Sequence, residues 1–218
     1  MGKFRGVLTD LDGTLYRCPD YEAEIRRLTL EIVSERLGIS LEEAARRIAE
    51  ARKVRVTLTR SLEYIGVPRS HFYDELSRRL NYRALLKPDP RIAEFLRELR
   101  RRGYKVAIIT NSGRPHALGT MGALGIPLDA VDALITSSDV SEPKTDPEPY
   151  LKGLELLGIR ASEAVYMGDR VEDEVKPAKK LGMTTVLVSQ QPVESPWVDY
   201  VIDSPFKLLD LLEEIDRD

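Results

Sequence analysis

The feature that most restricts the fold is a regular alternation of short apolar segments with segments of helical periodicity. Four of the apolar segments are as short and as uniformly apolar as strands covered on both faces of a sheet: 106–110, 133–136, 164–167 and 184–188. The helical segments between them end at Gly125, Gly158 and Gly182, and glycine commonly ends a helix. Strands and helices that alternate in this way build a parallel sheet with helices on both faces. The sequence therefore predicts an α/β protein with a doubly wound sheet.

One more strand and a long helical stretch precede this pattern. Residues 4–10 are mostly apolar and rich in strand formers. From about 19 to 83 the apolar residues recur at helical spacing, and no strand pattern interrupts them convincingly. We therefore expect a helical module at 17–86, inserted into a main domain that comprises residues 1–16 and 87–218.

Three elements are predicted towards the C-terminus. Residues 171–181 have the pattern of a helix, and residues 200–202 that of an edge strand. Ser204 and Pro205 then open a last helix, because proline favours the first turn of a helix.

Charge and composition argue against several classes of protein. The formal net charge is −3, whereas dedicated nucleic-acid binders usually carry a basic surplus. No run of about 18 apolar residues occurs, so we expect no membrane span. Cys18 is the single cysteine and has no partner for an intramolecular disulfide. The N-terminus has no signal-peptide pattern, so we expect a cytoplasmic protein. The oligomeric state is left open.

Ligands of a doubly wound sheet bind at the carboxyl ends of its strands. Polar residues follow four of the predicted strands: Asp10 and Asp12 after the first, Thr110 and Asn111 after the second, Lys144 after the third, and Asp169, Asp173 and Glu174 after the fourth. We expect these side chains to gather at one edge of the sheet.

Such a set of side chains suits phosphoryl transfer. Crowded carboxylates repel one another unless a cation neutralises them, and Mg²⁺ prefers hard oxygen ligands. Next to Mg²⁺, Asp10 is expected to attack the phosphate of a small phosphate ester. Asp12, two residues further on, is placed to protonate the leaving oxygen and later to activate water. Thr110 and Asn111 are expected to hold phosphate oxygens, and Lys144 to supply the remaining positive charge.

Four motifs in this order resemble the haloacid dehalogenase-like superfamily. They are Asp-Leu-Asp-Gly-Thr-Leu-Tyr at 10–16, Ile-Ile-Thr-Asn at 108–111, Lys144, and Gly-Asp-Arg at 168–170 with acids behind it. Together the motifs are highly specific, although Asp-x-Asp alone is common. The resemblance implies a Rossmann-like core with a helical cap between the first two motifs. The insert predicted at 17–86 fits that layout.

Carried over residue by residue, the resemblance implies that Asp10 is the nucleophile and Asp12 the general acid and base. Thr110 and Lys144 would bind phosphate. Asp10, the backbone carbonyl of Asp12, and Asp169 would hold Mg²⁺.

Two further details come from the same resemblance. Members place a second acid four or five residues after the first acid of the last motif, which is Asp173 or Glu174 here; we favour Asp173. Segments 86–90, 110–117 and 179–186 also look like the pyrimidine 5′-nucleotidase-like branch. His116 lies in the second of these segments, and we expect it to have a structural role or to lie at the edge of the substrate.

We therefore expect a magnesium-dependent phosphatase of small phosphomonoesters, with a nucleotide or sugar phosphate as substrate. A phosphomutase on the same scaffold remains open. A haloacid dehalogenase is disfavoured, because such enzymes need no Mg²⁺ and keep no second acid at the position of Asp12. A phospho-receiver module lacks an insert of this size, and the complete set of acids argues against a non-catalytic binding protein. No motif in the insert identifies the substrate.

Overall fold

The apolar segments of the sequence form a six-stranded parallel sheet. The computed structural model describes residues 2–55 and 57–216. The strands in chain order are β1 (Gly6–Thr9), β2 (Lys105–Ile109), β3 (Ala133–Ile135), β4 (Ala164–Gly168), β5 (Thr184–Val188) and β6 (Tyr200–Ile202). Across the sheet their order is β3-β2-β1-β4-β5-β6, and each neighbouring pair is parallel. The predicted α/β class is confirmed.

Helices cover both faces of this sheet. One face packs against α6 (Pro90–Arg101), α7 (Arg114–Leu124) and α10 (Leu208–Ile215), and the other packs against α8 (Glu148–Leu157) and α9 (Lys176–Lys180). Successive side chains of a strand point to opposite faces, so Val7 and Leu8 of β1 lie in two different core clusters. Both of these side chains are fully buried. The sheet is therefore doubly wound, as predicted.

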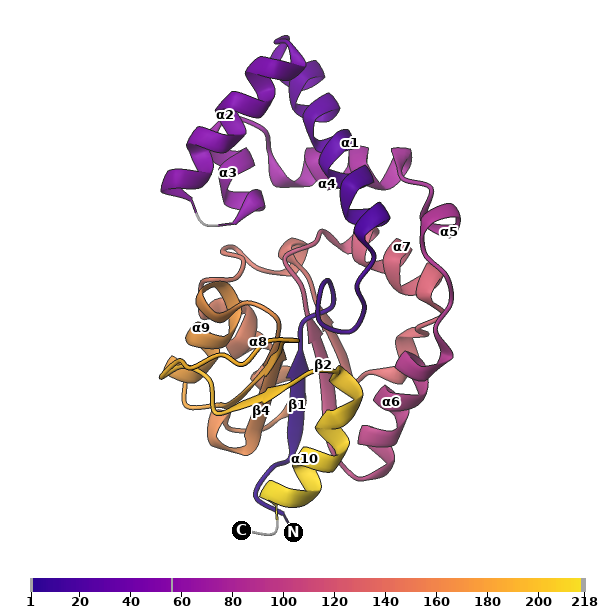
Figure 1. Cartoon of the computed structure of the whole chain (residues 1–218), viewed down its shortest axis with the longest axis vertical. Helices are drawn as coiled ribbons and strands as arrows, with labels where there is room; N and C mark the ends of the chain where they lie inside the picture. The colour runs from indigo at the N-terminus through magenta and orange to yellow at the C-terminus, as the bar shows by residue number, and fades with distance from the viewer. Residues whose placement is uncertain (1, 56, 217–218) are drawn as a thin grey trace.

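Between β1 and α6 the chain forms a helical insert that lies over one end of the sheet (Figure 1). Its helices are α1 (Pro19–Leu37), α2 (Leu41–Val54), α3 (Leu58–Tyr64), α4 (Arg69–Arg79) and α5 (Tyr82–Leu85). These five helices are called the cap below. Helix α10 and the start of β1 lie at the other end of the molecule (Figure 1). The division of the chain into a core and an insert at residues 17–86 stays a proposal.

The helix predicted at 171–181 is different in the structure. It opens with a π-helical turn at Val171–Val175, and α9 then continues only to Lys180. The amide of Val175 donates to the carbonyl of Arg170, five residues earlier, at 3.1 Å. Such a turn is wider than an α-helical one, so it shifts the direction in which later side chains point. The last helix also begins later than predicted, at Leu208, after a 3₁₀ turn at Pro205–Lys207.

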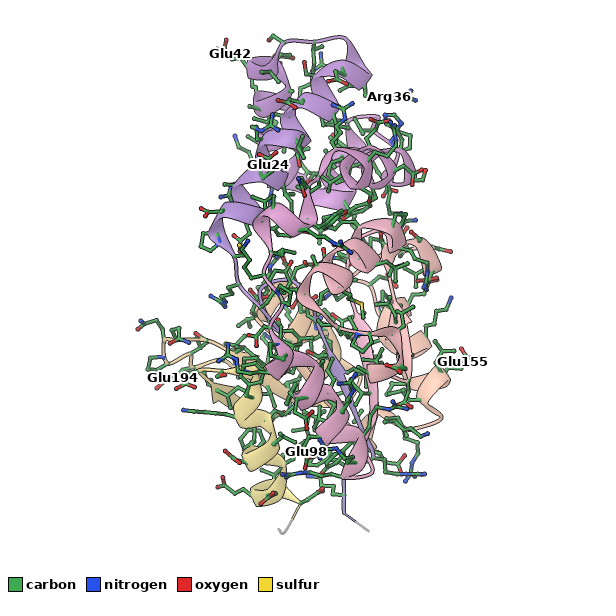
Figure 2. All side chains as sticks on the ribbon, turned by 90° about the vertical axis from the view of Figure 1, so that its right-hand side faces the viewer. Glu24, Arg36, Glu42, Glu98, Glu155 and Glu194 are labelled. Atoms are coloured by element: carbon green, nitrogen blue, oxygen red, sulfur yellow. The ribbon has the colours of Figure 1, made fainter. Side chains whose placement is uncertain are left out.

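Charged side chains project outward from both parts of the molecule. Figure 2 shows Arg36 and Glu42 at the far end of the cap, and Glu98, Glu155 and Glu194 on the outside of the core. Among the described residues, no helix combines the length and the apolar character that a membrane span needs.

Candidate active site

The carboxyl ends of β1, β2 and β4 open into a cleft of about 550 Å³ between the sheet and the cap. The strand order reverses at β1, which is where doubly wound sheets bind ligands. The core part of the wall includes Asp10, Asp12, Thr110, Asn111, Asp169 and Glu174, and the cap part includes Tyr21, Arg26, Arg52, Thr59, Phe72 and Tyr73. The structure thus brings together residues that lie far apart in the sequence.

A buried ion-pair network lies at the floor of the cleft. The Nζ of Lys144 donates to Oδ1 of Asp10 at 2.6 Å and to Oε1 of Glu174 at 2.9 Å. It also lies 3.4 Å from the hydroxyl of Tyr166 in β4. The Lys144 side chain is only 1% exposed, and a buried charge is stable only when it is paired in this way. Lys144 therefore has a fixed position next to the carboxylate of Asp10.

Asp12 is held by hydroxyl groups rather than by a cation. The hydroxyl of Tyr16 donates to its Oδ1 at 2.6 Å. The hydroxyls of Thr110 and Ser112 donate to its Oδ2 at 3.2 and 3.1 Å. These three donors fix the orientation of the carboxylate at the edge of the cleft. Tyr16 and Ser112 were not predicted as part of the site, although Tyr16 belongs to the first motif and Ser112 directly follows the second.

Thr110 and Asn111 occupy the expected place at the end of β2, but their contacts differ from each other. Thr110 donates to Asp12 and accepts from the amide of Ser112 at 3.0 Å. The Nδ2 of Asn111 donates to the backbone carbonyl of Lys144 at 2.8 Å. Asn111 thus fixes the loop that carries the lysine, while its own Oδ1 is buried and has no partner among the described residues.

The loop after β1 and the end of β4 approach each other closely at Gly13. This glycine has a φ of +91°, and a Cβ at this position would lie 2.6 Å from Oδ2 of Asp169. Any other residue would clash with the carboxylate and strain the backbone. Gly13 therefore permits the close approach of Asp169 to the loop after β1.

Three carboxylates form a group that fits a metal ion. One oxygen each of Asp10, Asp169 and Glu174 lie within 4.8 Å of one another. Two oxygens of these carboxylates, Asp169 Oδ1 and Glu174 Oε2, are buried and accept no hydrogen bond from any described residue. Buried acceptors without a donor are costly, and a bound cation would satisfy them. Oxygen ligands of this kind suit Mg²⁺.

The pKa values of the residues around this group also favour a bound cation. Burial raises the pKa of Asp10, Glu174 raises it further, and Lys144 acts in the opposite direction. Burial also raises the pKa of Asp169, and the guanidinium groups of Arg170 and Arg17 offset part of this effect. Burial lowers the pKa of Lys144, but the charges of Asp10 and Glu174 outweigh it, so the ammonium stays protonated. A divalent cation would relieve the remaining excess of negative charge.

The two acids of the last motif have different contacts in the structure, and the choice between them stays a prediction. Glu174 is buried and bonds to Lys144, whereas Asp173 lies 3.7 Å from Arg170 and contacts neither Lys144 nor the metal group in any described interaction. Both acids lie in the π-helical turn and line the cleft, and the wider turn sets the directions in which their side chains point. The role of Glu174 itself stays a proposal.

Aromatic side chains from the cap meet His116 of α7 at the side of the cleft. The ring of His116 lies between the hydroxyls of Tyr82, 3.0 Å from Nδ1, and Tyr21, 3.4 Å from Nε2. Its centroid is 5.9 Å from that of Tyr73. Burial lowers the pKa of His116, so the ring is neutral at pH 7. His116 thus has the structural place at the edge of the cleft that the sequence predicts.

The motif pattern has a match among known families. A family model of haloacid dehalogenase-like hydrolases matches residues 4–182. The chain belongs to the haloacid dehalogenase-like hydrolases. This confirms the resemblance on which the site was predicted.

Relatives of this haloacid dehalogenase-like chain extend over nearly its whole length. The glyceraldehyde 3-phosphate phosphatase of Methanocaldococcus jannaschii is 29% identical to this chain. The match covers 98% of this chain and 99% of that relative. The pyrophosphatase PpaX of Bacillus cereus is 29% identical, with 99% of each chain covered. The crystal structure of a phosphatase of the same family from Thermococcus onnurineus has a TM-score of 0.74 at 28% identity and covers 96% of this chain and 98% of its own. The prediction of a phosphatase is confirmed, and the finer resemblance to pyrimidine nucleotidases stays a prediction.

Proposed function

We propose that the chain is a magnesium-dependent phosphatase that hydrolyses a small phosphomonoester through an aspartyl-phosphate on Asp10. The observation that carries this proposal is the setting of Asp10, which is 3% exposed, bonded to Lys144 and within reach of two more carboxylates. An acid in this setting is oriented and lies beside groups able to balance the charge of a phosphate.

In the first step, an oxygen of Asp10 attacks phosphorus and the bond to the leaving oxygen breaks. The leaving oxygen takes a proton from Asp12, whose carboxyl lies two residues further along the same loop. Lys144 balances the charge that develops on the phosphoryl oxygens, because its ammonium is already held at Asp10. We propose that Thr110 and the amides of the loop after β2 hold those oxygens.

In the second step, water replaces Asp10. Asp12 takes a proton from this water, the oxygen of the water attacks phosphorus, and the acyl-phosphate bond breaks. Inorganic phosphate leaves and Asp10 is again a carboxylate. Tyr16 and Ser112 keep the Asp12 carboxylate in one orientation in both steps, since each donates to one of its oxygens.

We propose that Asp10, Asp169 and the backbone carbonyl of Asp12 hold Mg²⁺, and that Glu174 lies beside them on Lys144. When bound, the ion would shield the negative charges of nucleophile and phosphate from each other. The buried oxygens of Asp169 and Glu174 that accept no hydrogen bond from a described residue support this assignment.

We propose a small phosphate ester, of the size of a sugar phosphate or a nucleotide, as substrate. The cleft of about 550 Å³ supports this size, and its cap wall offers both aromatic rings and arginines. One relative is named for a three-carbon phosphate and another for pyrophosphate, which also indicates a small substrate. The cytoplasmic location is likewise a proposal.

A panel of phosphorylated metabolites, assayed with Mg²⁺ and with excess chelator, tests this function. The panel should contain glyceraldehyde 3-phosphate, pyrophosphate, sugar phosphates, nucleoside monophosphates and a generic aryl phosphate. We expect release of inorganic phosphate that stops in chelator. Full activity in chelator would contradict the metal assignment, and transfer of the phosphate within a sugar, without release, would identify a phosphomutase instead.

A further inference from the structure

The loop that carries Lys144 receives hydrogen bonds from two sides. Residues 140–147 are here called the lysine loop. On the core side, the amides of Ser141 and Glu142 donate to the two carboxylate oxygens of Glu148, the first residue of α8, at 2.9 and 2.8 Å. On the cap side, backbone carbonyls of the loop accept hydrogen bonds from two arginines. The loop is therefore clamped between α8 and the cap.

The first of these arginines is Arg69, which opens α4. Its Nη2 lies 3.4 Å from the carbonyl of Val140 and 3.3 Å from the carbonyl of Ser141. Its Nε lies 3.5 Å from the carboxylate of Glu63 in the cap. The side chain is only 21% exposed. Its contact with Glu63 means that the cap itself holds the guanidinium in place against the lysine loop.

The second is Arg60 of α3. Its Nη2 lies 2.9 Å from the carboxylate of Glu142 and 3.4 Å from the carbonyl of Pro143, the residue before Lys144. Its Nε is buried and has no hydrogen-bond partner in the described part of the chain. Arg60 thus contacts the lysine loop next to the catalytic side chain.

A second path joins the cap to the same lysine. The hydroxyl of Tyr73 in α4 donates to the carbonyl of Asn111 at 2.8 Å, and Asn111 donates to the carbonyl of Lys144 at 2.8 Å. Neither Arg60 nor Arg69 is among the described residues that line the cleft. The two arginines therefore act on the site through backbone carbonyls of the lysine loop, and not by contact with a substrate in the cleft.

We propose that Arg60 and Arg69 are positioning residues that fix the lysine loop from the cap and thereby hold the ammonium of Lys144 between Asp10 and Glu174. This inference rests on the proposed phosphatase function. According to this inference, the position of Lys144, a residue of the core, depends on the cap. A displacement of the cap would leave the core-side bonds of the loop to Glu148 intact and break the cap-side bonds to its carbonyls. Transfer of the phosphoryl group then needs the closed cap even for a substrate too small to touch it.

A double substitution, Arg60→Met with Arg69→Met, tests the inference. Methionine retains much of the apolar stem but removes the donors. With an aryl phosphate we expect kcat to fall roughly 10- to 100-fold, the range for small misplacements of reacting groups, while KM changes little. Arg60→Lys with Arg69→Lys should recover part of kcat, because lysine keeps a charged donor. Arg78→Met is the matched control, since Arg78 also lies in α4 but is exposed and pairs with Glu75.

Hydrogen exchange supplies a readout that needs no catalysis. In the double methionine variant the amide of Asp146, which donates to the carbonyl of Pro143, and its neighbours in the lysine loop should exchange faster, while those of β4 keep their wild-type rates. An unchanged kcat together with unchanged loop exchange would overturn the inference. So would a raised KM at constant kcat, which would mean that the arginines bind substrate, or faster exchange throughout the sheet, which would mean general destabilisation. A wild type that hydrolyses no phosphate ester would instead overturn the proposed function.

Discussion

At the scale of single residues, Asp10 and Asp12 have different surroundings although two positions separate them. Asp10 is buried against a lysine, while Asp12 is oriented by three hydroxyls. This contrast fits a nucleophile beside a positive charge and an acid–base group that must gain and lose a proton. Substitutions of Asp10 and Asp12 should therefore impair different steps of the reaction.

We expect Asp12→Asn to accumulate a phosphorylated protein from an aryl phosphate, because the nucleophile remains but the base of the second step is lost. Asp10→Asn should form none. Intact mass after a rapid acid quench measures the added phosphate, and neutral hydroxylamine should remove it as it removes an acyl phosphate. A phosphate that appears in Asp10→Asn, or that resists hydroxylamine, would show that another residue is the nucleophile.

The two acids at the end of the last motif offer a matched pair of variants. Glu174→Gln removes a charge that bonds to Lys144, and we expect activity or Mg²⁺ affinity to fall roughly 10- to 100-fold, as for other groups that support metal ligands. Asp173→Asn should cost at most about three-fold, because this side chain contacts Arg170 instead. Steady-state kinetics over a Mg²⁺ titration measures both effects in the two variants. A larger loss in Asp173→Asn would reverse the assignment made here.

At the scale of elements, the strands and most of the motifs after them could be predicted from the sequence, because the strands are largely apolar and Asp10, Thr110 and Asp169 each follow a strand directly. The π-helical turn at Val171–Val175 could not, since its residues have ordinary helical patterning and one extra residue per turn leaves no mark in composition. That turn carries both Asp173 and Glu174. The contacts of Arg60 and Arg69 were equally beyond the sequence, because an arginine on a helix face is usually solvated.

The aromatic contact between α1, α5 and α7 has a consequence for stability at acid pH. His116 has a lowered pKa in the folded protein because it is buried, so it binds a proton more readily after unfolding. Stability from the neutral ring is fully present above the ordinary pKa of about 6.5 and is lost as the pH falls below it. We expect the free energy of unfolding to fall by up to about 1.4 kcal/mol per pH unit in that range.

Urea unfolding between pH 7.5 and pH 5, for the wild type and for His116→Gln, measures this contribution. The variant removes the titrating group, so its stability should depend less steeply on pH over that interval. Equal slopes for the two proteins would mean that His116 keeps its ordinary pKa in the folded state.

At the scale of the whole molecule, the acids at the site should oppose folding until a cation binds. Burial raises the pKa of both Asp10 and Asp169, so their ionisation costs stability as the pH rises above the ordinary values. Mg²⁺ should therefore raise Tm, by roughly 5 °C or more at about 100 times its Kd, and the shift should be larger at pH 7.5 than at pH 5.5.

Thermal unfolding with Mg²⁺ and with chelator tests this expectation. Asp169→Asn should abolish most of the shift. Glu172→Gln should keep it, because Glu172 is exposed and pairs with Lys176 beside the site. A shift that survives in Asp169→Asn would place the ion elsewhere in the molecule.

The central position of β1 also has a consequence for how the chain is made. Gly6 of β1 pairs with Lys105 on one side and with Ala164 on the other. During synthesis this first strand leaves the ribosome long before either neighbour exists, whereas the cap helices, which pack on one another, can assemble early. The nascent chain must therefore keep an apolar strand unpaired until about half of these 218 residues have emerged. A ribosome-bound chain that stops before β4 would contain both Asp10 and Lys144 and still have no site.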